Sequence, residues 1–303
     1  MNSPDPTLYE HGPNVKPRRS ALFMPGNNAR ALDKARNLPA DCLIMDLEDA
    51  VAPSGKQQAR EQIRHALLSG GYGRRELIVR INSLNSPWGH ADLTSVAELP
   101  IDAVLLPKVE QSDEIRQARE LLLAHGDTAE LALWIMIETP RGVVNAESLC
   151  RQQAGLDCVV MGTSDLARDL RLAPSVDRTG LQHALAHCVL VARMYELEIL
   201  DGVHLDLNDS AGLEQSCRQA RELGFDGKTL IHPKQVEIAN RIFAPDAEQI
   251  RLASAIINAW QEASANGMGV CVVEGQLIEH LHVSEAQRLL DLGEAIARQG
   301  QSP

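Results

Sequence analysis

The sequence contains few aromatic residues and no long apolar run. Phe, Trp and Tyr together make up 3% of the 303 residues, so a folded core must be built from aliphatic side chains. No stretch approaches the ~18 apolar residues that a membrane-spanning helix needs. The N-terminus, MNSPDPTLYEHGPNVKPRRS, has no hydrophobic region of the kind found in secretory signals. We therefore expect a cytoplasmic protein without a membrane partner.

Basic charge is also scarce. The chain has 29 Lys and Arg against 41 Asp and Glu, a formal net charge of −12. Nucleic-acid-binding proteins need a basic face, so we expect no nucleic-acid partner. The one dense basic group is Lys16, Arg18 and Arg19. It predicts either a solvated N-terminal segment or a small anion site.

The cysteines show no spacing typical of a disulfide framework or a metal site. The six cysteines are scattered without a C-x-x-C pair, and several lie within apolar or helical patterns: Cys42, Cys150, Cys158, Cys188, Cys217 and Cys271. Buried free cysteine behaves as a small hydrophobic residue. The spacing therefore predicts reduced core thiols, with neither disulfides nor a zinc site.

Eight short apolar runs alternate with amphipathic stretches. The runs are ALFMPG, CLIMDLEDAV, ELIVRINS, AVLLPKV, LALWIMIETP, CVVMGTSDL, EILDGVHLD and KTLIHP. Strands without a polar face, each followed by a helix, are typical of a parallel sheet buried on both sides. Eight such units predict an α/β protein with a (β/α)₈ TIM barrel. An open doubly wound sheet is the alternative, but MPGNNAR after the first run is not the G-x-G-x-x-G turn such folds often carry.

The predicted organisation has three parts. Residues 1–17 form an N-terminal segment, residues 18–244 the barrel with the catalytic site, and residues 245–303 a C-terminal extension. The extension contains two long helical patterns around VVEGQLIE, which is typical of a short ribbon. We expect it to act as a lid or as an arm that packs on another subunit.

Polar residues follow most of the predicted strands. They are Asp46, Glu48 and Asp49; Arg80 and Asn82; Lys108; Glu138; Asp165; Asp201, His204 and Asp206; and His232. In a TIM barrel the active site lies at the C-terminal ends of the strands. Hard carboxylate oxygens suit Mg²⁺, which takes one or two protein carboxylates and completes its coordination with other oxygens. Glu138 and Asp165, from neighbouring strands, are the predicted metal ligands.

The other charged residues have predicted roles around that metal. Arg80 would hold an anionic substrate oxygen and stabilise developing negative charge. Glu48 and Asp49 would accept hydrogen bonds from metal-bound water. Each carboxylate taken alone could instead be a structural cap, and Asp165 could merely begin the next helix. The number of acids at adjacent strand ends, together with Arg80, favours the catalytic interpretation.

With these residues in view, the chain resembles the citrate lyase β-subunit-like branch of the HpcH/HpaI aldolase superfamily. The matching pieces, in the family's order, are RRSALFMPGN, DCLIMDLEDAV, RINSLNSPWGHADL, LPKVE, MIETPRGVVNA, MGTSDLARDL, DGVHLDLND and GFDGKTLIHPKQVEIANRIFAP. They cover about residues 18 to 245. The resemblance implies a TIM barrel, dependence on Mg²⁺, and reversible carbon–carbon cleavage of β-hydroxyacyl thioesters.

The resemblance also implies residue roles. Glu138 and Asp165 match the family's metal ligands, and Arg80 its substrate-binding arginine, so Arg80 and Glu138 would both act on the substrate. Glu48 and Asp49 match the acidic pair near the metal. The family's acid/base aspartate, which crosses a subunit interface, falls in EGQLIEHLH, where this chain has Glu279 instead. Glu274 stands where the family often has an aspartate. The longer Glu279 side chain puts its catalytic role in doubt and suggests a different substrate preference.

The expected reaction is retro-Claisen cleavage of a citramalyl-CoA or malyl-CoA type thioester to acetyl-CoA and a 2-keto acid. The alternatives are cleavage of a citryl group on a carrier protein, aldol cleavage of a free acid, and a non-catalytic binding subunit. The resemblance and the C-terminal extension further imply a homo-oligomer, a trimer or a multiple of trimers.

Overall fold

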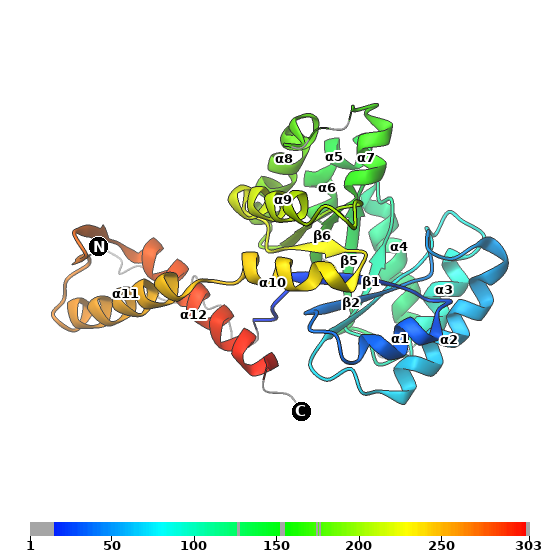
Figure 1. The fold of residues 1–303 in the computed structure, drawn as a ribbon, viewed down its shortest axis with the longest axis horizontal. Coiled ribbons are helices and arrows are strands. Elements are labelled where there is room, and N and C mark those ends of the chain that lie inside the picture. Colours follow the sequence, from blue (N-terminus) through cyan, green and yellow to red (C-terminus); the bar gives the residue numbers. More distant parts are fainter. Residues whose placement is uncertain (1–14, 126–127, 152–154, 174, 176, 301–303) are drawn as a thin grey trace. The chain divides into compact units, whose positions relative to one another are not determined.

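Eight parallel strands form a closed barrel in a computed structural model that describes residues 15–125, 128–151, 155–173, 175 and 177–300 (Figure 1). The strands are β1 (Ser20–Pro25), β2 (Cys42–Asp46), β3 (Glu76–Arg80), β4 (Ala103–Leu106), β5 (Ala132–Ile137), β6 (Leu156–Met161), β7 (Glu198–Asp201) and β8 (Gly227–Leu230). Each strand pairs with the next one in the sequence, and β8 pairs with β1. The predicted (β/α)₈ fold is confirmed.

Helices follow the strands and surround the barrel. They are α1 (Ala29–Ala35), α2 (Lys56–Ser69), α3 (Gly89–Val96), α4 (Ser112–Leu123), α5 (Pro140–Val144), α6 (Ala146–Cys150), α7 (Thr163–Asp169), α8 (Gln182–Met194), α9 (Ser210–Leu223) and α10 (Val236–Phe243). Local sequence sets their ends. Before α9, the Asp209 side chain accepts a hydrogen bond from the Gly212 amide, and after it Gly224 adopts a φ of 98°, a left-handed conformation that favours glycine.

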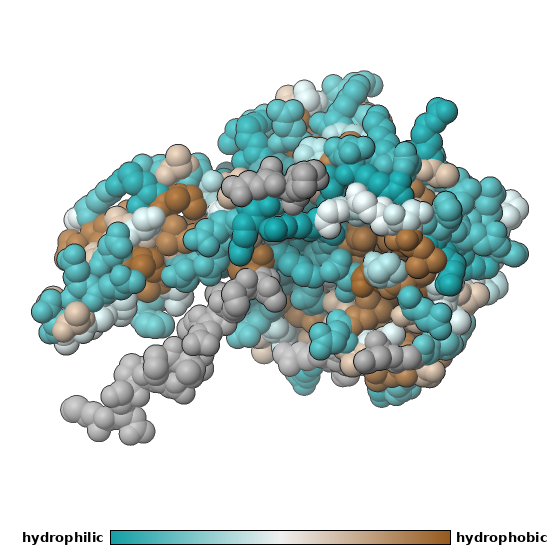
Figure 2. Space-filling view, turned by 90° about the horizontal axis from the view of Figure 1, so that it is seen from below, coloured by the Kyte–Doolittle hydropathy of each residue, from teal (hydrophilic) through white to brown (hydrophobic). Residues whose placement is uncertain are grey.

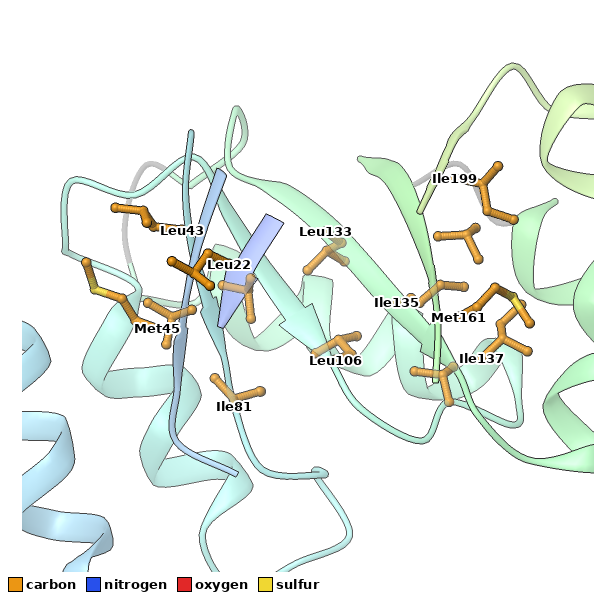
Figure 3. Close-up of a cluster of buried hydrophobic side chains, with 14 of the residues drawn as sticks. Leu22, Leu43, Met45, Ile81, Leu106, Leu133, Ile135, Ile137, Met161 and Ile199 are labelled. Carbon is orange, nitrogen blue, oxygen red and sulfur yellow. The ribbon is translucent and has the colours of Figure 1, made fainter. Parts of the chain in front are cut away.

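Two apolar clusters lie on opposite faces of the barrel wall. Successive strand residues alternate between them: on β2, Ile44 belongs to a cluster made only of strand residues, whereas Leu43 and Met45 pack with helix residues. The first cluster therefore fills the barrel interior, around the fully buried Trp134. Figure 3 shows the second, in which aliphatic side chains from several strands meet. The core is aliphatic, as the composition predicts.

The N-terminal end of the barrel, here called the floor, is closed by ion pairs. Arg18 donates two 2.7 Å hydrogen bonds to Glu76, also contacts Asp157, and lies over the Trp134 ring. Arg19 makes a similar two-bond contact with Asp41. The prediction of a solvated segment or anion site at these arginines is wrong. Both are buried, because the carboxylates at the strand starts already neutralise them.

The chain divides into two compact units, one of them Arg18–Phe243 and the other Met1–Pro17 with Ala244–Pro303. The first 14 residues of the predicted N-terminal segment lie outside the described residues. The second unit contains α11 (Ala247–Ala265), β9 (Cys271–Val273), β10 (Gln276–Ile278) and α12 (His280–Gly300). Strands β9 and β10 form the predicted short ribbon, and they pair antiparallel.

The surface carries both polar and apolar side chains. Figure 2 shows hydrophobic residues gathered in patches between hydrophilic ones on the face that it draws. Exposed large apolar residues include Val144, Leu190, Met194, Val272 and Leu277. Within the described parts of the chain, every helix is too short or too polar to cross a lipid bilayer.

Candidate active site at the C-terminal mouth of the barrel

Charged side chains continue the inward-facing series of the barrel beyond its apolar layers. On β2 the inward residues Cys42 and Ile44 are followed by Asp46, and on β3 Ile78 is followed by Arg80. Asp46 and Arg80 are direct register partners in the sheet. By the same alternation, Glu138 comes two residues after Met136 at the end of β5. The strand periodicity therefore directs these residues to the C-terminal mouth.

Arg80 is anchored by Asp46. Its Nε and Nη2 donate to the two carboxylate oxygens of Asp46 at 2.7 and 2.6 Å. The backbone amides of Glu48 and Ala50 also donate to that carboxylate. Burial works to lower the pKa of Arg80, but the attraction and hydrogen bonds of Asp46 outweigh it and raise the pKa. Arg80 is thus a fixed positive charge, with its Nη1 side turned away from Asp46.

Glu48 joins Arg80 to Lys108. The Lys108 ammonium donates to Glu48 Oε1, and Arg80 Nη1 lies 3.0 Å from Glu48 Oε2. That second contact is off the hydrogen-bonding direction, so within the described chain Oε2 is buried without a hydrogen bond. Burial raises the pKa of Glu48, although Arg80 and Lys108 oppose the rise. Asp49 is more exposed and lies 3.6 Å from the Lys108 ammonium.

Glu138 is the carboxylate with surplus charge. It is 2% exposed, and its Oε1 accepts a 2.8 Å hydrogen bond from the Lys108 amide. No ion pair within 4 Å involves Glu138 among the described residues. Burial, with the nearby charge of Glu48, raises its pKa to about 7 against the attraction of Lys108 and Arg80. A divalent cation would stabilise this carboxylate in its charged form.

Gly162, at the end of β6, leaves the space that Glu138 occupies. A Cβ at position 162 would lie 2.1 Å from the Glu138 Cβ and 2.5 Å from its Oε2. Gly162 also donates a 2.9 Å backbone hydrogen bond to Ile137. Because only glycine fits, the β5 and β6 strand ends hold Glu138 in a close-fitting cradle.

Asp165 lies three residues beyond Gly162, in the first turn of α7. It does not cap that helix, since Gly162 holds the cap position without a side-chain bond. Its carboxylate pairs with Arg168 at 2.6 Å. The described residues contain no cluster of three or more His, Cys, Asp or Glu fit to hold a metal. Two carboxylates and the Gly162 cradle nevertheless suit Mg²⁺, which keeps most of its coordination for water and substrate.

Asp201, which was expected near the mouth, serves the barrel wall instead. Asp201 follows the inward-facing Leu200 and so faces the helices, where it pairs with Lys228 at 2.5 Å and Arg178 at 2.8 Å. His204 and His232 follow β7 and β8. The His204 ring nitrogen Nε2 lies 3.8 Å from Asp209 and is buried without a hydrogen bond among the described residues, whereas the His232 ring caps the turn at Pro233–Gln235.

Glu279 belongs to the second compact unit. It follows β10, is exposed, and its amide donates to the His282 ring. Glu274 and Gly275 form the ribbon turn with φ values of 50° and 81°, and Glu274 pairs with Arg251 at 2.7 Å. Positive φ at both central residues is typical of a tight hairpin turn.

Sequence reasoning missed the groups that orient the site. Asp46 was treated only as one of several strand-end acids, although it fixes Arg80. Lys56 was not singled out, although its ammonium binds the backbone beside Glu48. A lysine that opens a helix eight residues after Glu48 gives little signal in a single sequence.

Comparison with known proteins places this geometry in a family. The family model HpcH/HpaI aldolase/citrate lyase matches residues 19–233. The chain belongs to the HpcH/HpaI aldolase/citrate lyase family. A (3S)-malyl-CoA thioesterase of Cereibacter sphaeroides (strain KD131 / KCTC 12085) is 44% identical over 93% of this chain and 96% of its own length. The mitochondrial citramalyl-CoA lyase of Rattus norvegicus is 32% identical over 92% of this chain and 87% of its own.

A solved member of the family has the same architecture. The crystal structure of CitE from Mycobacterium tuberculosis, in complex with magnesium, acetoacetate and coenzyme A, has a TM-score of 0.72 and 28% identity, covering 91% of this chain and 97% of that one. This HpcH/HpaI chain is therefore an enzyme of the carbon–carbon lyase class, among relatives that act on CoA esters. The predicted resemblance to citrate lyase β subunits is confirmed.

Proposed function

We propose that this enzyme cleaves the carbon–carbon bond of a β-hydroxyacyl-CoA thioester of the malyl-CoA or citramalyl-CoA type, with Mg²⁺ held by Glu138 and Asp165. The observation that carries the proposal is the state of Glu138. It is a buried carboxylate at a strand end, without an ion pair among the described residues, beside two fixed cations. The relatives' names supply the substrate class.

The residues of the mouth divide the work of a retro-Claisen cleavage. Mg²⁺ would supply a Lewis acid that polarises oxygens of the departing keto acid. Glu138 and Asp165 hold that ion, and Gly162 leaves room for Glu138. Asp46 occupies Nε and Nη2 of Arg80, so the substrate's negative oxygen would be met by Nη1, which lies beside Glu48 and the Met136 sulfur. Lys108 and Arg80 both favour the charged form of Glu48, against the burial that raises its pKa.

The leaving acetyl-CoA enolate needs a proton at its carbon. We assign this step to the Glu279 carboxyl, which is exposed on the second unit and able to exchange protons with solvent. The Glu279→Gln variant should lose cleavage while keeping the affinity for Mg²⁺.

We also infer that the chain forms a homo-oligomer, a trimer or a multiple of trimers. Light scattering measures the mass that checks this inference.

Thioester hydrolysis is a second candidate function. The observation that favours it is the 44% identical relative, which is a (3S)-malyl-CoA thioesterase. In hydrolysis, water attacks the thioester carbonyl and CoA leaves as a free thiol. In carbon–carbon cleavage the thioester bond survives in acetyl-CoA, and the other product is a keto acid. The two reactions therefore differ in which products they release.

The deciding experiment follows both products from (3S)-malyl-CoA and citramalyl-CoA. Free thiol is measured with a disulfide reagent, and keto acid as its phenylhydrazone. We expect keto acid without free thiol, lost in EDTA and restored by Mg²⁺. Free thiol without keto acid would assign hydrolysis, and neither product from either ester would overturn the proposal. Citryl-carrier protein and free hydroxy-keto acids, tested alongside, separate the remaining reactions of the family.

A further inference from the structure

Lys56 is a buried lysine whose ammonium group binds backbone carbonyls. It opens α2 and is 5% exposed. Its Nζ donates to the carbonyl oxygens of Leu47 and Glu48 at 2.7 and 2.8 Å, and to the side-chain oxygen of Asn82 at 2.8 Å. Three donors thus meet three acceptors. No carboxylate of the described chain lies within 4 Å of this ammonium, so its charge serves the carbonyls of the loop after β2.

Asn82 extends the same contact. Its side-chain amide donates to the Leu47 carbonyl at 2.8 Å and to Asp92 at 2.5 Å, and its backbone amide also donates to Asp92. Arg60 fixes the other Asp92 oxygen at 2.7 Å. Leu47 therefore accepts from two side chains at once. The loop is held from β3 and α2 together.

The Trp88 ring covers the ammonium group from another side, 5.3 Å from Nζ. This contact shields the group from water and favours its charged form. Burial lowers the pKa of Lys56, and the charges of Asp46 and Asp92 oppose that change. An enclosed cation with three directed bonds allows the loop carbonyls little freedom.

We propose that Lys56 is a positioning residue, which with Asn82 fixes the backbone of Leu47 and Glu48 so that the Glu48 carboxylate lies between Arg80 and Lys108. The inference rests on the proposed function, because Glu48 acts there beside the metal site. Without the Lys56 hydrogen bonds, the peptide of Glu48 can rotate, and the Glu48 carboxylate is no longer held between Arg80 and Lys108. A displacement of about 1 Å at a reacting group costs of order 10²-fold in rate.

The same barrel offers a matched control in Lys228. Lys228 is fully buried, lies on the helix-facing side of the wall and pairs with Asp201, remote from the loop after β2. Lys56→Met and Lys228→Met remove the same charge from two buried places, of which that of Lys228 is the deeper. Both should lower the melting temperature, because each leaves acceptors without their donor. If Lys56 is a positioning residue, only Lys56→Met should also lower kcat and the affinity for Mn²⁺.

The experiment compares wild type, Lys56→Met, Asn82→Ala, the double variant and Lys228→Met. Three quantities are measured: the melting temperature, Mn²⁺ affinity by electron paramagnetic resonance, and kcat and KM for the active thioester. We expect Lys56→Met to lower kcat about 10²-fold with little change in KM. Mn²⁺ affinity should fall about 10- to 100-fold, the range typical of residues behind metal ligands. The double variant should lose less than the product of the single losses.

Each result decides the matter. Unchanged kcat and Mn²⁺ affinity in Lys56→Met, or losses equal to those of Lys228→Met, would overturn the proposal. If Lys56→Met does not fold, Asn82→Ala carries the same comparison, because it removes the second donor to Leu47. A wild-type enzyme that cleaves no thioester would refute the proposed function, whereas the Mn²⁺ affinities would still judge Lys56.

Discussion

Both ends of the barrel are rich in buried charged residues, but they differ in how fully these charges are paired. At the floor, Arg18 and Arg19 each hold a carboxylate through two hydrogen bonds. At the mouth, Arg80 holds Asp46 in the same way, yet Glu138 lies beside this pair with no cation of its own among the described residues. The ion pairs of the floor are complete, whereas the mouth contains one carboxylate, that of Glu138, without an ion pair among the described residues.

A second carboxylate sharpens the contrast. Glu198, at the start of β7, has its pKa raised to about 8 by burial and by the charge of Asp226. Glu138 has a pKa of about 7 for a similar reason. A surplus carboxylate in a protein takes a proton or a cation. Glu198 lies near the acids Asp226 and Asp157 and near the cations Arg18 and Arg193. Under the proposed function the metal ion binds at the mouth, and the carboxylate at the floor takes a proton instead.

The largest effect should come from removing the charge of Glu138. Glu138→Gln keeps the size of the side chain but removes a metal ligand, and we expect kcat/KM to fall by about 10³-fold. Mn²⁺ affinity should fall with it. Glu198→Gln is the matched control, a change of the same chemistry at the opposite end of the barrel, and it should keep full activity. Equal activities in these two variants would refute the division between mouth and floor.

Breaking the floor should cost stability instead of activity. Arg18→Met removes the cation that binds Glu76, and loss of one partner from a buried pair costs about 3–5 kcal/mol. Urea unfolding should show this loss in the free energy of unfolding. At a temperature where the variant remains folded, its kcat should match wild type. A large fall in kcat would show that the floor is coupled to the chemistry.

A smaller effect is expected from filling the space beside Glu138. Gly162→Ala places a Cβ within 2.1 Å of the Glu138 Cβ, so the ligand must move. A shift of about 1 Å corresponds to about 10²-fold in rate. Gly55→Ala is the control, because its Cβ would meet Val51 at 3.5 Å and Asn27 at 4.0 Å, both ordinary contact distances. The Mn²⁺ affinity of the two variants distinguishes a displaced ligand from a general loss of stability.

The fold could be predicted from the sequence because the strand signal is local. Eight buried runs, each followed by a helical pattern, allow few arrangements, and ends such as Asp209 and Gly224 carry their own chemistry. Glu138 and Arg80 were found at the mouth because strand-end position is also local information. The periodicity of β7 could equally have placed Asp201 outside, since Leu200 before it faces inward.

The remaining features depend on contacts between distant residues. Lys56 contacts Glu48, eight residues before it, and Asn82, 26 residues after it. The local sequence around Lys56 predicts neither contact. Arg18 meets Glu76 58 residues away and Asp157 139 residues away, so its burial could not be read from the basic N-terminal pattern. Partners of buried charge are decided by tertiary packing, which a single sequence leaves open.

The smallest predicted effect concerns pH. Glu138 must lose its proton to bind Mg²⁺. With a pKa of about 7, the affinity for Mg²⁺ should therefore fall by up to tenfold per pH unit below ~7 and stay constant above it.

The stability of the metal-free protein should change with pH in the opposite direction. Both glutamates hold protons in the folded state above their ordinary pKa of 4.5, so the free energy of unfolding should decrease as pH rises from ~4.5 to ~8. Glu198→Gln should reduce that decrease and leave the Mg²⁺ titration unchanged. A Mg²⁺ affinity that shifts in Glu198→Gln would mean that the two ends of the barrel share one electrostatic balance.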